Sequence, residues 1–231
     1  VSVEQVYRKG RLVNDAMFDR QAAPIAESML HTVVLSGVSK DKIQVPARGK
    51  VPVIGMVSGQ IVTKFLREEV PSCEGWFVPN REYSKLCVFE RHRGTGNAKA
   101  APLKGYGITG GAIATSVAHD SHNIIAAGDN DDDILTAVQM MEKMQGGYVL
   151  VSGGEVKGTL PLPVAGLLSL GSSQEIQENI DDMLKKAWDM EISREIDPFI
   201  TLSFMALPVI PELRLTDLGL VDVTHFKQIE T

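Results

Sequence analysis

The clearest periodic pattern in the chain is the segment 131–147, "DDDILTAVQMMEKMQGG". Ile134, Val138, Met141 and Gln145 fall at the spacing of one helix face, with acidic residues in the first turn and two glycines at the end. Acids are favoured at the positive end of the helix dipole, and glycine ends helices because it adopts a positive φ without strain. The pattern predicts an amphipathic helix that ends at the glycine pair.

A second apolar stripe runs through "SSQEIQENIDDMLKKAWDME", residues 172–191. Ser172 or Ser173 can cap this segment, since a hydroxyl accepts hydrogen bonds from free amides of the first turn. The segment is therefore predicted to be a second helix, with one face packed on the core. The residues of that face are Ile176, Ile180, Met183, Leu184 and Ala187.

The other apolar runs are short, rich in β-branched residues and separated by turn residues, as is typical of strands. A final apolar segment, 197–223, is broken by Pro208 and Pro211, which predicts a short helix or strand that then wraps the surface. The predicted hairpins and strands lie in 3–13, 51–66, 85–91, 110–118, 123–128 and 148–163.

Composition agrees with a mixed fold. The 231 residues are 44% hydrophobic but only 6% aromatic, and 21 glycines with 11 prolines indicate many turns. We expect an α+β protein of β-sheet layers with packed helices. The polar connection before residue 45 predicts two parts, residues 1–45 and 46–231.

The net charge and the cysteine content indicate which kinds of partner and which cellular compartment to expect. A net charge of −6 gives no electrostatic reason to bind nucleic acid or an anionic membrane surface. Two cysteines, without a disulfide framework, a signal peptide or an apolar run of transmembrane length, favour a reducing compartment. We therefore expect a cytoplasmic protein with no nucleic-acid or membrane partner.

Titratable residues are concentrated in "SVAHDSHNIIAAGDNDDD", residues 116–133. A helix or a turn, but not a strand, would bring His119 and His122 together, and Asp120 beside them could fix a histidine tautomer for general acid or base chemistry. The alternative is a polar turn whose side chains bond local amides, and spacing alone favours it. The "GDNDDD" run lacks the glycine and distal glutamate of a calcium loop, so Asn130 or Asp131 is instead expected to cap the helix.

A second group of polar residues, "FERHRGTGN", ends the strand predicted at 85–91. Glu90 and His92 lie where a strand enters a glycine-containing loop, a position that often carries function. An exposed cluster of ion pairs on a turn is an equally good interpretation.

Three separated motifs carry a family resemblance: "GGAIATSVAHDSHNIIAAGDNDDD", "LPLPVAGLLS" and "FITLSFMALPVIPELRLTDLGLVDV". Together, and in this order, they resemble the C-terminal region of bacterial and archaeal adenine deaminases of the amidohydrolase superfamily, over about residues 51–223. The opening hairpin also resembles the last hairpin of the small β-sandwich that flanks the metal-bearing (β/α)8 barrel of such enzymes.

The resemblance implies hydrolysis of adenine to hypoxanthine and ammonia, with manganese or another divalent metal activating the water. The metal ligands of the family lie on the barrel that precedes this region. This chain has no His-x-His pair and no room for a barrel of roughly 250 residues, so metal ligands are not expected here. The partners implied are adenine, the preceding barrel and further copies of the chain in a homo-oligomer, and the chain alone is expected to be inactive.

Two hypotheses follow. In the first, the domain completes or covers the barrel active site: His119, Asp120 and His122 move protons, while Glu90, His92 and Asn123 bind the substrate. In the second, the domain is a structural or oligomerisation module, and the same polar residues satisfy one another in a buried network.

Overall fold

The computed structural model of the chain describes residues 2–14, 17 and 24–229. A mixed eight-stranded sheet organises it, in the strand order β12-β11-β9-β10-β7-β8-β3-β4. β3 and β8 pair in parallel and the other pairs of this sheet are antiparallel. The strands are β3 (Lys50–Met56), β4 (Thr63–Glu69), β7 (Tyr83–Phe89), β8 (Ala98–Lys104), β9 (Ala112–Thr115), β10 (Ile124–Gly128), β11 (Gly147–Ser152) and β12 (Glu155–Pro161).

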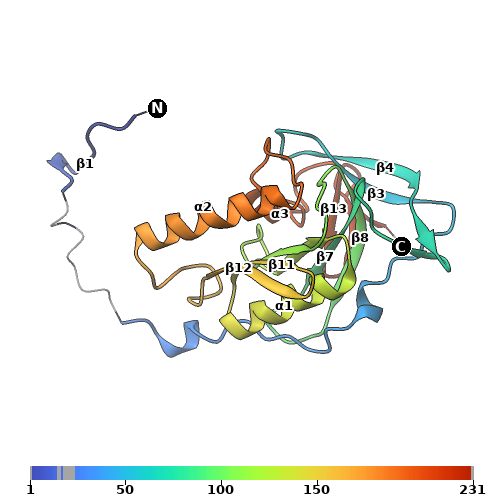
Figure 1. Cartoon of the computed structure of the whole chain (residues 1–231), viewed down its shortest axis with the longest axis horizontal. Helices are drawn as coiled ribbons and strands as arrows, with labels where there is room; N and C mark the ends of the chain where they lie inside the picture. Colours follow the sequence, from blue (N-terminus) through green and yellow to red (C-terminus); the bar gives the residue numbers. More distant parts are fainter. Residues whose placement is uncertain (1, 15–16, 18–23, 230–231) are drawn as a thin grey trace.

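Helices cover both faces of this sheet (Figure 1). Helix α1 (Asp131–Met144) packs on one face, and α2 (Ser173–Asp189) and α3 (Pro198–Phe204) pack on the other. Neighbouring strand residues face opposite layers, so Leu86 belongs to the core beside α2 and α3, and Cys87 to the core beside α1. The predicted α+β class, with helices packed on a sheet, is confirmed.

Smaller elements complete the molecule. A three-stranded sheet, in the order β13-β14-β15, follows α3. The segment 197–223, predicted to form a short helix or strand, therefore forms both a helix and strands. The remaining elements are β1 (Tyr7–Arg8), β2 (Arg11–Leu12), η2 (Glu27–Met29), η3 (Lys40–Ile43), β5 (Ser72–Cys73), β6 (Trp76–Phe77), β13 (Leu213–Thr216), β14 (Gly219–Asp222) and β15 (Lys227–Ile229).

Both predicted helix starts are confirmed. The Asn130 side chain accepts a hydrogen bond from the Asp133 amide at 2.8 Å and caps α1. Ser172 caps α2 in a reciprocal capping box with Glu175, whose carboxylate accepts from the Ser172 amide at 2.7 Å.

The end of α1 differs from its prediction in one residue. Gln145, expected on the apolar stripe, is the C-terminal cap with φ +60°. Its side-chain oxygen accepts from the Val33 amide at 3.1 Å, and its side-chain nitrogen donates to the Val33 carbonyl at 3.2 Å. The same side-chain nitrogen also donates to the Glu142 carbonyl at 2.9 Å, so Gln145 joins the end of the helix to a distant segment.

That distant segment is residues 32–47, named here the strap. Val33, Ile43, Val45 and Ala47 are buried in the same core as α1. Most of the strap lies before the predicted boundary at residue 45, which stays a prediction. The β1–β2 hairpin lies away from this core in Figure 1, and residues 2–12 are exposed. Its likeness to a sandwich hairpin also stays a prediction.

Candidate functional site

Two loops that carry the predicted site residues lie side by side at one end of the sheet. The histidine loop, residues 116–123, joins β9 to β10, and residues 90–97 join β7 to β8. They meet because β7 and β10 are neighbours, with Phe89 opposite Ile124. The His92 ring nitrogen Nε2 lies 2.7 Å from the Ser121 carbonyl oxygen and links the loops directly.

A turn brings His119 and His122 together. The His122 amide donates to the Ala118 carbonyl at 2.6 Å, and His122 has φ +50°. The ring centroids of the two histidines are 6.1 Å apart, edge to face, and the His119 ring also packs at 4.8 Å against Phe204 of α3. Of the two arrangements that would join the histidines, the structure has the turn.

His122 is held as a neutral imidazole. Its Nδ1 accepts from the Ala118 amide at 3.3 Å, which leaves the ring proton on Nε2. Burial lowers the pKa of His122 below its ordinary value, and the nearby His119, Arg91 and His92 lower it further against the opposing effect of Asp120. At neutral pH this ring can therefore accept a proton at Nδ1 only by giving up its bond to Ala118, whereas its Nε2–H can donate a hydrogen bond.

Asp120 does not hold a histidine tautomer by direct contact. Its side chain is exposed, and no hydrogen bond between it and either imidazole is found in the described part of the chain. The Ala118 amide takes the place that the sequence interpretation gave to this carboxylate. Asp120 acts on His122 through its charge alone.

Glu90 fastens its own loop. Its carboxylate accepts from the amides of His92 (2.5 Å), Arg93 (2.8 Å) and Thr95 (2.9 Å) and from the Thr95 hydroxyl (2.9 Å). Burial by itself would raise the pKa of Glu90, but the hydrogen bonds outweigh burial and lower that pKa below its ordinary value. These contacts occupy the carboxylate that was predicted to bind substrate.

Replacing Glu90 with glutamine should lower the melting temperature at pH 7, because an amide nitrogen would face donors that now meet an oxygen. The lowered pKa means that the stability due to Glu90 is fully present above the ordinary value of 4.5 and is lost as pH falls through the folded-state pKa. The gap between the wild-type and Glu90→Gln melting temperatures should therefore close below pH 4.5, which thermal scans from pH 7 to pH 3 would reveal. Glu178→Gln, on the exposed face of α2, is the control, and a gap that persisted unchanged at pH 3 would contradict this account.

Asn123 is buried, with an exposed fraction of 4%. Its side-chain nitrogen donates to Asp217 at 3.1 Å, and Asn97 donates to the other oxygen of the same carboxylate at 3.2 Å. The Asn123 side-chain oxygen has no partner among the described residues. Asp217 lies in the turn between β13 and β14 and was not found from the sequence, since its partners are 94 and 120 residues away.

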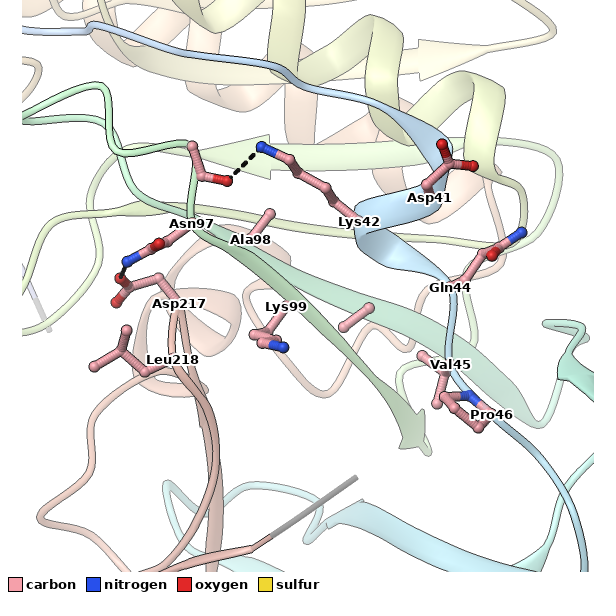
Figure 2. A pocket seen from close by; sticks show the side chains of 12 residues that line it. Asp41, Lys42, Gln44, Val45, Pro46, Asn97, Ala98, Lys99, Asp217 and Leu218 are labelled. Atoms are coloured by element: carbon pink, nitrogen blue, oxygen red, sulfur yellow. Dashed lines mark hydrogen bonds between the residues drawn. The ribbon is translucent and has the colours of Figure 1, made fainter.

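A pocket of about 390 Å³ lies beside this cluster (Figure 2). Asn97 and Asp217 line one wall, Asp41 and Gln44 line the opposite one, and Lys99 lies between them. None of the predicted site residues lines it. The histidine loop and this pocket are therefore separate features.

The acidic run 129–133 is structural. The Asp129 carboxylate accepts from the amides of residues 110 and 111 at 2.5 and 2.9 Å, and the Asp133 carboxylate from those of residues 153 and 154 at 3.1 and 2.7 Å. The other two acids form ion pairs with lysines. No group of three or more histidine, cysteine, aspartate or glutamate side chains suited to a metal ion occurs among the residues that the structure describes.

The geometry can be set beside known proteins. Residues 60–227 match the family model of the adenine deaminase C-terminal domain. The chain belongs to this family. It is 44% identical to an adenine deaminase of Desulfitobacterium hafniense over 99% of the chain, and 45% identical to adenine deaminase 2 of Carboxydothermus hydrogenoformans over 86% of the chain. An adenine deaminase of Halalkalibacterium halodurans is 39% identical over the whole chain.

These family members are much longer than the chain. The chain spans 40%, 35% and 41% of the length of the three relatives. The predicted resemblance to the C-terminal region of adenine deaminases is confirmed. Within the described residues, no helix of this family member is both long and apolar enough to cross a membrane.

Proposed function

We propose that the chain is the C-terminal portion of a full-length adenine deaminase, which converts adenine and water to hypoxanthine and ammonia. In that enzyme the histidine loop completes or covers the active site of the preceding barrel. The observation that carries this proposal is the meeting of His119, His122 and His92 on two adjoining loops at one end of the sheet. Membership of the adenine deaminase family gives this cluster its reaction.

Each polar residue of the two loops is assigned a role according to its contacts. His122 is neutral at rest and carries its proton on Nε2. When Nδ1 leaves the Ala118 amide and takes up the proton released by the attacking water, Nε2 can pass its own proton to the amino group that leaves as ammonia, and the ring is again neutral. Asp120 stabilises the charged form of His122 through its own charge. His92 is exposed and is the group left for contact with the purine, while Glu90 holds the 90–97 loop. The Asn123 side-chain oxygen has no partner among the described residues but is buried, so it can contact the purine only where the histidine loop opens in the full-length enzyme.

The resemblance implies manganese or another divalent metal in the full-length enzyme. The described residues of this chain do not fit such an ion: they form no suitable group of ligands, and the His122 Nδ1 faces the Ala118 amide. We therefore place no metal ligand and no metal-dependent step on this chain.

The alternative is a structural or oligomerisation module. The hydrogen bonds of Glu90 within its loop, and the bridge from Asn123 and Asn97 to Asp217, favour it, because these polar groups serve the fold. The two functions differ in one measurable respect, since only the first needs the imidazole of His122.

The chain alone should release no ammonia from adenine, with or without added manganese, iron or zinc, whereas the full-length protein should. The reason is that the metal ligands implied by the family lie outside this chain. Ammonia release by the purified 231-residue chain at the rate of the full-length protein would refute the proposal. An inactive full-length protein, supplied with metal and adenine, would refute the assigned reaction.

A further inference from the structure

Arg91 is a fully buried cation at the end of β7. It is 1% exposed, and its hydrogen-bond partners among the described residues are neutral oxygens. Burying a guanidinium among carbonyls is costly unless its donors are satisfied, so its position must be specified by those partners. The mechanism proposed above makes no use of this residue.

The partners of Arg91 belong to three segments that are far apart in sequence. Nε donates to the His122 carbonyl at 2.5 Å, Nη1 to the Thr32 carbonyl at 3.1 Å and Nη2 to the Ala165 carbonyl at 3.0 Å. These carbonyls lie in the histidine loop, in the strap and in the loop that follows β12. The planar fork of one arginine thus holds the three segments in register.

Gly166, the residue after Ala165, leaves room for the guanidinium group of Arg91 because it has no side chain. It has φ +72°, and a Cβ built on it would lie 2.6 Å from Arg91 Nη1, which is too close for any other residue without a shift. The Gly166 carbonyl accepts from the Ser116 hydroxyl at 2.6 Å, so the same loop also holds the first residue of the histidine loop.

We infer that Arg91 is the positioning residue of the histidine loop, and that it couples the orientation of His122 to the strap and to the loop after β12. Fixing the His122 carbonyl fixes a residue whose φ is positive and whose ring must reach the Ala118 amide. The consequence for deamination rests on the proposed function. The strap also contacts the backbone of Arg91, since the Val34 amide donates to the Arg91 carbonyl at 2.8 Å, so a displacement of the strap reaches the His122 carbonyl through Arg91.

The test uses the 231-residue chain and Arg91→Lys, which keeps the charge but replaces the three nitrogens of the planar fork with one compact ammonium that cannot span all three carbonyls. Hydrogen exchange of the Ala118 and His122 amides should become faster by about tenfold or more, since the loop loses charge-assisted bonds. The His122 imidazole nitrogen signals in NMR spectra should also move, because the ring no longer faces the Ala118 amide. Unchanged exchange and unchanged imidazole signals in a folded variant would overturn the inference.

Arg214 supplies a matched control. It is also fully buried, and it also donates to backbone carbonyls, those of Ile210, Phe204, Ile61 and Pro211, besides one contact with Met205 Sδ at 3.9 Å. Arg214→Lys should destabilise the fold in the same way yet leave the exchange of the Ala118 and His122 amides unchanged relative to core amides of α1. Equal acceleration in both variants would reduce the role of Arg91 to general stability and overturn the inference.

If Arg91→Lys does not fold, a second pair of variants with smaller changes tests the same inference. Gly166→Ala presses on the guanidinium, whereas Gly110→Ala imposes the same backbone strain, at φ +74°, with no atom within 4 Å of the added carbon. Only Gly166→Ala should accelerate exchange at Ala118 and His122, and the same exchange in both variants would refute the coupling. These readouts need no turnover, so the inference and the proposed function can fail separately.

Discussion

Replacing His122 with alanine in the full-length protein should lower the rate of adenine deamination by about 10² to 10⁴-fold, the usual cost of losing a proton-transfer group. The neutral ring, with its proton on Nε2, is the group lost. His122→Asn should lose the same activity while tolerating the positive φ better than alanine, so its melting temperature should stay closer to that of the wild type. Turnover and thermal midpoints of both variants would be measured together.

Two further variants serve as comparisons for the His122 variants. His31→Ala removes an imidazole whose side chain is 72% exposed and distant in sequence from the histidine loop, and it should leave turnover unchanged. Asp120→Asn should reduce turnover less than either His122 variant, because the Ala118 amide, not Asp120, holds the ring. Wild-type turnover with a lowered midpoint in His122→Ala and His122→Asn would assign the loop to structure and favour the module hypothesis.

Local patterns predicted the elements of the fold well. Both long helices, their caps at Asn130 and Ser172, and the hairpin over residues 153–154 follow from signals within one segment. The order of the strands, the parallel pairing of β3 with β8 and the packing of the strap against α1 depend on contacts between distant segments. Hydrophobic periodicity says which face of an element is buried, but not which element covers that face.

The candidate site shows the same division. The turn that joins His119 to His122 spans four residues, so the sequence could indicate it. The roles of Arg91 and Asp217 arise from partners that are 31 to 120 residues away, and neither residue carries a local signal. Asp120 was assigned from adjacency alone, and the amide that holds His122 belongs to the backbone, which no side-chain motif reveals.

The acidic run at the start of α1 offers the largest expected effect on stability. The Lys85 side chain, in the middle of β7, is 3% exposed and lies 2.6 Å from Asp131, whose side chain is 25% exposed. Asp131→Ala would leave a buried ammonium group without its carboxylate, which typically costs about 3 to 5 kcal/mol. We expect the free energy of unfolding at pH 7, from urea titration, to fall by about 3 kcal/mol, the lower end of that range, because Asp131 is partly exposed.

The neighbouring acid and the partner lysine make this prediction specific. Asp132 pairs with Lys40 at 2.7 Å, but the two side chains are 78% and 52% exposed, so Asp132→Ala should leave the free energy of unfolding nearly unchanged. The double variant Lys85→Met/Asp131→Ala should recover most of the loss, because an apolar side chain of similar length replaces the unpaired charge. Equal effects of Asp131→Ala and Asp132→Ala, or no recovery in the double variant, would show that the acids act through the helix dipole alone. In that case burial of Lys85 would not be what requires an aspartate at the first position of α1.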